Sequence, residues 1–439
     1  MSTQTSTSTS SLSHVPATES VPSASPAPEV LPSFRPHSWF PVAGSMVAVA
    51  WGGNEFTPLL VMYRETSHFS QVTVNGLLAA YVLGIVPALL VGGPLSDLIG
   101  RKPTLLPAAP LSLLGSFLLS IAPHEPLIIA LGRVLCGMAL GLVMAVGSTW
   151  ITELVSRAGG DPAAGARKAS LCLTIGFLVG AGIASVLAQW GPWPTHLAYI
   201  LHILLTLATA VWLTYTPETR EPRHGTVKTT ILELKVREML EMLHIPAAAH
   251  KRFLRVVVPV APWVFGCAGA AYALLPQLLA TSAGQTPIAF SGLMTVITLG
   301  CGVGVQMLGR LIDTHKSARA SAIAMAVITL GAFVAAFAAQ TLSLPLGIAA
   351  AATMGAGYGL ALVAGLSEVQ RIAGEEELAG LTAVYYSISY TGFFIPMAFS
   401  ALSAYIGFTK LFIIGSILAI LCLINVTIAW RAHLPGAQR

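Results

Sequence analysis

Charge is scarce in this sequence. Only 9% of its 439 residues are charged, whereas 55% are hydrophobic and the mean hydropathy is +0.76. Soluble globular proteins carry about 25% charged residues. So few charges cannot cover a large surface that faces water, and this composition excludes an ordinary soluble domain. We therefore expect most of the surface to face lipid.

Catalytic and metal-binding motifs are also lacking. The five cysteines lie scattered within apolar runs, without metal-ligand spacing or an obvious pairing. No H-E-x-x-H or G-x-S-x-G motif occurs, and the histidines are dispersed, mostly in tails and loops. We therefore predict no enzymatic activity, no catalytic residue, no metal and no cofactor.

Long apolar runs, by contrast, are abundant. A helix needs roughly 20 mostly apolar residues to cross a bilayer. Windows of that kind lie near 40–63, 73–92, 103–122, 126–152, 169–189, 195–216, 256–280, 289–309, 319–340, 344–366, 380–404 and 409–430. The sequence thus predicts an all-α membrane protein with twelve transmembrane helices.

The basic residues predict the orientation of these spans. A net charge of +5 would fit a nucleic-acid binder, but the charges are placed otherwise. If the spans alternate from a cytoplasmic N-terminus, the connections on the opposite side hold only Arg64 and Lys410. This bias follows the positive-inside rule. It predicts a multi-pass protein of the cytoplasmic (inner) membrane with both termini in the cytoplasm, and no nucleic-acid partner.

Composition shifts divide the chain into five segments. The N-terminal stretch is rich in Ser, Thr and Pro and lacks a basic start followed by an apolar region, so it is not expected to be a secretory signal. The predicted segments are a disordered cytoplasmic tail at 1–37, a six-helix bundle at 38–216, a cytoplasmic linker at 217–255, a second six-helix bundle at 256–431 and a cytoplasmic tail at 432–439.

The linker carries an amphipathic pattern. Leu232, Val236, Met239, Leu240 and Leu243 fall on one helical face, and charged residues occupy the remainder. This pattern predicts a helix lying along the inner membrane surface.

The two bundles repeat each other. GGPLSDLIGRK after the second span resembles LGRLIDTHK after the eighth, so that Gly93 and Asp97 correspond to Gly309 and Asp313 at an offset of 216. GLVMAVG in the fourth span resembles GLALVAG in the tenth at an offset of 218. Two matches at nearly one offset indicate duplication, and tandem six-span halves are typical of transporters.

The stretch Gly93-Pro-Leu-Ser-Asp97-Leu-Ile-Gly100-Arg101-Lys102 resembles the loop 2–3 signature of the major facilitator superfamily, G-x-x-x-D-[RK]-x-G-[RK]-[RK]. "PETR" at the end of the sixth span and the six-six division extend the resemblance over everything beyond the N-terminal tail. The resemblance implies the major facilitator fold, with twelve spans in two pseudo-symmetric bundles. It further implies a drug/proton antiporter-like member.

Further motifs refine this expectation. Arg133-Val-Leu-Cys-Gly137 resembles an R-x-x-x-G motif associated with proton-coupled members. The fifth span keeps Gly176 and Gly180 of the antiporter motif G-x-x-x-G-P-x-x-G-G, but Ala181 stands where proline is expected, which puts the direction of transport in doubt.

The loop signature suggests roles for its residues. Gly93 would permit close approach of two helices, and Asp97 would accept hydrogen bonds or pair with a base. Arg101 and Lys102 would anchor at anionic head groups and bridge helices across the cytoplasmic entrance. Leu98 stands where a basic residue is usual, which weakens the expected charge contacts at this entrance.

Glycines in the helices have a simpler expected role. Small residues let helix backbones approach closely in membranes. We assign that role to Gly137 and Gly141 in the fourth span and to Gly176 and Gly180 in the fifth.

Four polar residues lie at membrane depth. An ionisable group there costs roughly 2.5–3.5 kcal/mol or more, so it normally faces the bundle interior and has a partner. Glu55, Arg133 and His202 fall in the same half of one bundle, and Asn54 is expected to line the same cavity. We take Glu55 as the proton-carrying or cation-binding group, with Arg133 moving nearer or farther between conformations. The alternative is a static Glu55–Arg133 pair that holds helices together.

Together these patterns predict a secondary active transporter that works by alternating access. A proton-coupled exporter of small, neutral or cationic organic compounds is the first expectation, and a proton symporter that imports a metabolite is the alternative. A membrane-embedded enzyme or a receptor fits less well. The expected partners are a small-molecule substrate, protons and the lipid bilayer, and the expected state is a monomer.

Overall fold

The structure, a computed structural model, describes residues 34–223, 225–233, 243–314, 317–374, 377–432 and 434. These residues form helices joined by turns, and their only β feature is an isolated bridge between Thr314 and Ser317. The predicted all-α fold class is thereby confirmed. The predicted tail up to residue 33, the amphipathic segment 234–242 and most of 432–439 lie outside the described residues.

The first half precedes the linker. Its elements are α1 Phe40–Asn54, α2 Leu60–Thr66, α3 Gln71–Ile99, α4 Arg101–Leu105, α5 Ala108–Ile121, α6 Pro126–Leu142, the π-helical turn η1 Val143–Gly147, α7 Ser148–Arg157, α8 Pro162–Trp190 and α9 Leu197–Leu213. We call this the N half.

The C half follows the linker helix α10 Val227–Glu233. Its elements are η2 Pro246–Ala249, η3 Phe253–Val257, α12 Val258–Gly269, η4 Ala270–Leu274, α13 Leu275–Leu279, α14 Pro287–Ile312, α15 Arg319–Thr341, α16 Leu344–Ile372, α17 Leu378–Tyr390, η5 Thr391–Phe393, α18 Phe394–Ile406 and α19 Phe408–Ile428.

Ten helical stretches of the described chain are long and apolar enough to cross a membrane. The other two predicted spans have shorter elements. The sixth is the 17-residue apolar helix α9, and the first is divided into α1 and α2 by a turn at residues 55–59. Pro58 lies in that turn, where it removes a backbone N–H donor and so favours an interruption of the helix. The count of twelve spans stays a prediction.

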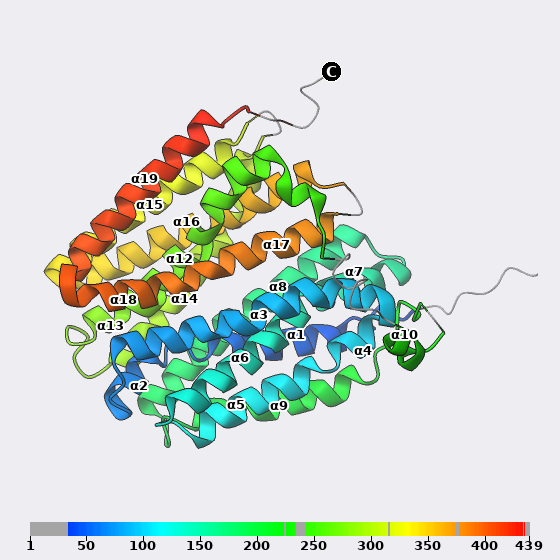
Figure 1. Cartoon of the computed structure of the whole chain (residues 1–439). Helices are drawn as coiled ribbons and strands as arrows, with labels where there is room; N and C mark the ends of the chain where they lie inside the picture. Colours follow the sequence, from blue (N-terminus) through cyan, green and yellow to red (C-terminus); the bar gives the residue numbers. More distant parts are fainter. Residues whose placement is uncertain are drawn as a thin grey trace, which may run out of the picture.

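The two halves share one packing scheme (Figure 1). α6 packs on α3 and on α5 in the N half, as α16 packs on α14 and on α15 in the C half. α1 packs on α8 as α12 packs on α17, and α5 packs on α9 as α15 packs on α19. These equivalent contacts agree with the repeat in the sequence.

Glycines permit the closest of these contacts. A Cβ atom at Gly137 or Gly141 would come within 3.0 Å of a carbonyl oxygen on α3, and one at Gly355 or Gly359 would do the same on α14. Both pairs are related by the offset of 218 residues. On α8, Gly176 and Gly180 abut the backbone of α1 in the same way.

The halves meet through α3 against α17 and α18, and through α8 against α14. We call the end of the molecule that carries the linker the linker end; it lies at the right of Figure 1. The other end, which carries α2 and α13, is the opposite end. The two ends differ in how the halves contact each other.

Candidate functional site

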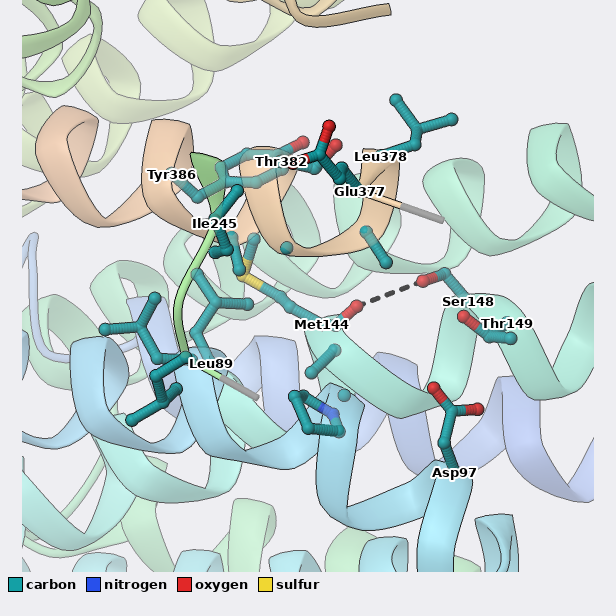
Figure 2. A pocket seen from close by; sticks show the side chains of 18 of the residues that line it. Leu89, Asp97, Met144, Ser148, Thr149, Ile245, Glu377, Leu378, Thr382 and Tyr386 are labelled. Atoms are coloured by element: carbon teal, nitrogen blue, oxygen red, sulfur yellow. Dashed lines mark hydrogen bonds between the residues drawn. The ribbon is translucent and has the colours of Figure 1, made fainter. Parts of the chain in front are cut away.

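A cavity of about 830 Å³ lies between the two halves at the linker end (Figure 2). α3, η1, α7 and α8 contribute one wall, and α16 and α17 contribute the other. Met144 on η1 and Tyr386 on α17 line it from opposite halves. π-Helical turns are frequent at functional sites, and η1 places Met144 in this wall.

The charges of the cavity come from helix ends and the linker. The charged side chains that line it are Asp97, Arg220, Glu221, Arg223 and Glu377. The remaining described lining residues are uncharged or histidine, and most are apolar. This lining suits a ligand with a large apolar surface and few charges.

Hydrogen bonds join the halves at the opposite end. Asn75 on α3 donates to Ser400 Oγ on α18 at 2.8 Å and accepts from Gln277 Nε2 on α13 at 3.0 Å. All three side chains are buried. Gln189 on α8 accepts hydrogen bonds from two backbone N–H groups in the first turn of α14, at 3.0 and 3.1 Å. The molecule is therefore closed at this end and open at the linker end.

Glu55 lies in the turn between α1 and α2 and is fully buried inside the N half. Its Oε1 accepts a hydrogen bond from Ser116 Oγ on α5 at 3.2 Å and lies 3.5 Å from His202 Nδ1 on α9. The carboxyl group therefore points toward α5 and α9 rather than into the cavity. Glu55, Asn54, Arg133 and His202 are absent from the described residues that line the cavity.

The hydrogen bonds of His202 settle which ring nitrogen carries the proton. Nε2 lies 3.0 Å from Ala48 O, and a carbonyl oxygen can only accept, so Nε2 donates. In a neutral ring Nδ1 is then an acceptor, and the single hydroxyl proton of Ser116, whose Oγ lies 2.7 Å away, can be donated to Nδ1 or to Glu55 Oε1 at any one time. A proton on either Glu55 Oε1 or His202 Nδ1 can thus be shared by the pair.

Arg133 is fully buried beside this pair. Its guanidinium carbon lies 4.1 Å from the ring centroid of Tyr81 and 4.6 Å from that of Phe56, and Nη1 donates to Gly53 O at 3.2 Å. Aromatic faces attract a buried cation. Among the described residues, Nε and Nη2 find no hydrogen-bond partner, and neither does Glu55 Oε2.

The structure thus brings together Glu55 and His202, with Arg133 close by. The static Glu55–Arg133 ion pair of the sequence-based alternative is absent from the ion pairs of the described residues, where Glu55 pairs with His202. Asn54 supports the turn instead of lining the cavity: it donates to Phe177 O at 3.0 Å and accepts from Thr57 Oγ1 at 2.8 Å.

Arg101 and Lys102 of the loop signature join helix ends within the N half, and their anchoring at lipid head groups stays a prediction. The Arg101 side chain is buried and binds Asp97 at 2.9 Å, Glu153 at 2.7 Å and Ser96 at 2.6 Å, all in the N half. Lys102 Nζ instead donates to two carbonyl oxygens just after α9, at 2.6 and 3.1 Å, where the helix dipole is negative.

The glycines of the signature have different roles. Gly93 faces the cavity, and a Cβ there would meet nothing within 4 Å, so the predicted close helix approach at Gly93 is wrong for this conformation. Gly100 has φ +104°, and a Cβ there would lie 2.8 Å from Glu218 Oε2. Gly100 is therefore the position that requires glycine. A Cβ at Gly309 would make ordinary contacts with α16, starting at 3.4 Å.

The C half forms its charged cluster with other residues. Asp313 binds Arg371, which also binds Glu368 at 2.7 Å. Arg252 binds the same Glu368 through Nε and Nη2, at 2.5 and 2.8 Å. Ser317 occupies the position equivalent to Arg101 at the offset of 216, so these arginines come from elsewhere in the half.

Two kinds of site residue were not predicted from the sequence. Ser112 and Ser116 surround His202 from α5; their spacing of one helical turn in an apolar span was the available signal. Tyr81 stacks on Arg133, but a single tyrosine in an apolar helix has no sequence signal that separates this role from packing.

Comparison with known proteins places this geometry in a family. The family model of the Major Facilitator Superfamily matches residues 42–395. A probable polyol transporter (polyol transporter 6) of Arabidopsis thaliana is 26% identical over 141 residues, which are 32% of this chain and 28% of that protein.

Solved transporter structures have the same fold. The nucleoside transporter NupG superposes with a TM-score of 0.71 at 12% identity, covering 90% of this chain and 99% of that one. A peptide transporter in complex with sulfate superposes with a TM-score of 0.70 at 14% identity, covering 91% of this chain and 96% of that one. The xylose transporter XylE from E. coli, in a partially occluded inward-open conformation, superposes with a TM-score of 0.62 at 14% identity. The match covers 88% of this chain and 95% of that one.

Identities this low indicate the fold alone, whereas the family model covers most of the chain. The chain is a multi-pass membrane transporter rather than an enzyme, and it belongs to the Major Facilitator Superfamily.

Proposed function

We propose that the protein exports a small neutral or cationic organic compound in exchange for protons. The cavity at the linker end would receive the compound from the cytoplasm, and the halves would then rock to open the opposite end. This proposal includes the predicted orientation, with both termini in the cytoplasm of a cell bounded by a cytoplasmic (inner) membrane, and a functional monomer.

The observation that carries the proposal is the buried Glu55–His202 pair beside Arg133. Burying an acid, a histidine and an arginine inside a membrane helix bundle costs free energy, and such residues usually mark a functional site. Glu55 Oε2 and Arg133 Nε and Nη2 lack partners among the described residues. Leaving such groups unpaired costs about 1–3 kcal/mol each, so a state that pairs them is within reach.

Two states of the cluster follow from these contacts. With one proton shared by Glu55 and His202, the pair is neutral and Arg133 is stabilised by Tyr81, Phe56 and Gly53 O. When that proton leaves toward the cytoplasm, Glu55 becomes a carboxylate and attracts the free donors of Arg133. A proton from the other side restores the first state, which yields one proton inward for each cycle.

Flux in proteoliposomes tests the coupling. We would impose a pH gradient in each direction, record lumenal pH with a trapped dye, and add tetraphenylphosphonium as an apolar cation or sorbitol as a neutral polyol. Export predicts that tetraphenylphosphonium moves against the proton flow. Glu55→Gln, which cannot ionise, is expected to lower gradient-driven flux by about 100-fold, within the usual range for loss of an acid–base group.

Glu125→Gln serves as the matched control, because Glu125 is exposed just before α6 in the same half. It should transport as the parent does. Unchanged gradient-driven flux in Glu55→Gln would remove Glu55 from the mechanism, and turnover of a compound without flux would argue against a transporter.

A proton symporter that imports a metabolite is the second candidate. The similarity to a probable polyol transporter favours it, although that match spans a third of this chain. The same vesicles distinguish the two, because a symporter would accumulate sorbitol in the direction of proton flow.

A further inference from the structure

Tyr81 connects the buried proton cluster to the interface between the halves. It lies on α3, the helix that packs on α17 and α18 of the C half. Its ring lies under the Arg133 guanidinium at 4.1 Å, yet its hydroxyl extends beyond this stack. That hydroxyl is buried and has no hydrogen-bond partner among the described residues.

The hydroxyl of Tyr81 lies against the end of α1. A Cβ at Gly53, the residue whose carbonyl binds Arg133, would overlap this hydroxyl. The helix that carries Tyr81, α3, packs on α17, which ends at Tyr390 in the C half. Tyr81 therefore lies against the end of α1, on the helix that packs on α17 of the other half.

An aromatic cluster around Tyr390 leads to the cavity. Tyr390 stacks on Phe265 with ring centroids 4.3 Å apart, and its hydroxyl donates to Met144 Sδ across the interface at 3.2 Å. Met144 lines the cavity. Arg133 thus contacts Tyr81 on α3, α3 packs on α17, and Tyr390 at the end of α17 contacts Met144 in the cavity wall.

We propose that Tyr81 is the positioning residue through which the charge of the Glu55 cluster controls opening of the cavity. The inference rests on the proton coupling proposed above. While Glu55 and His202 share a proton, Arg133 stays on the Tyr81 ring and α3 keeps its position against α17. When Glu55 is charged, Arg133 turns to the carboxylate, the ring loses its cation, and α3 is free to shift at the interface.

Other titratable groups face these residues. Around Glu55 and Tyr81 they are His202, Tyr63, Tyr199, Arg133, Cys136, Tyr272 and Tyr390. Of these, Glu55 and His202 are the pair that lies close together, 3.5 Å apart, and histidine is the residue type whose unperturbed charge change falls between about pH 5 and pH 8. Any pH response that passes through Tyr81 must therefore depend on Glu55 as well.

Spin-label distances across the cavity test the inference with the proton as the only ligand. Labels would be placed at Thr149 on α7 and Leu378 on α17, which lie on opposite walls (Figure 2), after the five native cysteines are replaced. Purified full-length protein in lipid nanodiscs would be measured across that pH range. We expect the open fraction to change with pH, by at most about tenfold per pH unit, the limit for one proton.

Three variants separate the outcomes. Glu55→Gln should abolish the pH response; if it does not, the proposed coupling through Glu55 fails. Tyr81→Met, which removes the ring face, should abolish it as well, while Tyr81→Phe, which keeps the ring, should retain it. Tyr385→Met is the control, because Tyr385 is equally buried but binds carbonyl oxygens of α16.

The inference about Tyr81 fails alone if Glu55→Gln abolishes the response and Tyr81→Met keeps it. It also fails if Tyr81→Phe loses the response, or if Tyr385→Met loses it as Tyr81→Met does, because the effect would then be general loss of packing. Should Tyr81→Met not fold, the Tyr81→Phe result still decides whether the ring stack or the hydroxyl matters.

Discussion

The two halves share a packing scheme but place their charges differently. Among the described residues of the C half, the buried charges lie at the linker end, where Glu368 binds both Arg252 and Arg371. The N half has a similar cluster around Arg101, but it also buries Glu55, His202 and Arg133 within the bundle. The two halves therefore share a scaffold, but within the described ranges only the N half encloses such a centre within its bundle.

The quality of pairing separates the two kinds of cluster. Glu368 is bound by two arginines with short contacts, and one nitrogen of that cluster, Arg371 Nε, lacks a partner among the described residues. In the N-half centre, Glu55 Oε2 and two nitrogens of Arg133 lack partners in the same described part of the chain. A well-paired cluster stabilises one arrangement, while an incompletely paired one can change partners. We propose on this basis that the linker-end charges of the C half serve structure and that the N-half centre serves the transport cycle.

Glu368→Gln is expected to have the largest effect on stability. Removing this carboxylate leaves Arg252 and Arg371 short of charge compensation in a buried site, which costs about 3–5 kcal/mol. Glu55→Gln should cost less than about 1 kcal/mol, because Glu55 already lacks part of its pairing. Thermal unfolding of the detergent-solubilised proteins measures both, and equal losses would show that the two clusters do not differ in this way.

Alanine at the duplicated glycines tests the shared scaffold. Gly137→Ala and Gly355→Ala each place a methyl group against a carbonyl oxygen of the neighbouring helix, and each should lower stability by about 1–3 kcal/mol. Gly93→Ala is the control: with nothing within 4 Å, it should leave stability unchanged or raise it by about 0.5–1 kcal/mol. A large loss in only one half would contradict equivalent packing.

Asn75→Ala should have a smaller effect on stability than Glu368→Gln and a visible effect on conformation. It removes two hydrogen bonds between the halves, worth about 1–2 kcal/mol together, and so should favour opening of the opposite end by roughly 5–30-fold. Spin labels at Glu65 and Thr341, exposed residues of the two halves at that end, would report this shift.

Thr73→Ala is the matched control, since Thr73 bonds only to Ser70 in the first turn of the same helix. The fraction of molecules that are open at the opposite end should be the same in Thr73→Ala as in the parent. An unchanged distance in Asn75→Ala would mean that the close contact of α8 with α14 is sufficient to keep this end closed.

Much of the fold was accessible from the sequence. Low charge, long apolar runs and the repeated Gly93–Asp97 and Gly309–Asp313 motifs led to a duplicated helical transporter, and the fold class is confirmed. The sequence predicted that Glu55 lies near Arg133 and His202, but it did not predict the hydrogen bond from Ser116. Residue counts along a helix give depth to about one turn but not the direction in which a side chain points.

Composition and spacing determined, by themselves, that this chain lies in lipid, that its helices repeat and that its acids and bases must be enclosed, because each follows from the cost of exposing polar groups to hydrocarbon. The tertiary structure alone decided that the helix breaks at Glu55, that its carboxyl group turns toward His202 rather than the cavity, and that Arg133 rests on Tyr81. Those choices depend on contacts between segments that are distant in the chain, and packing in three dimensions is what selects among them.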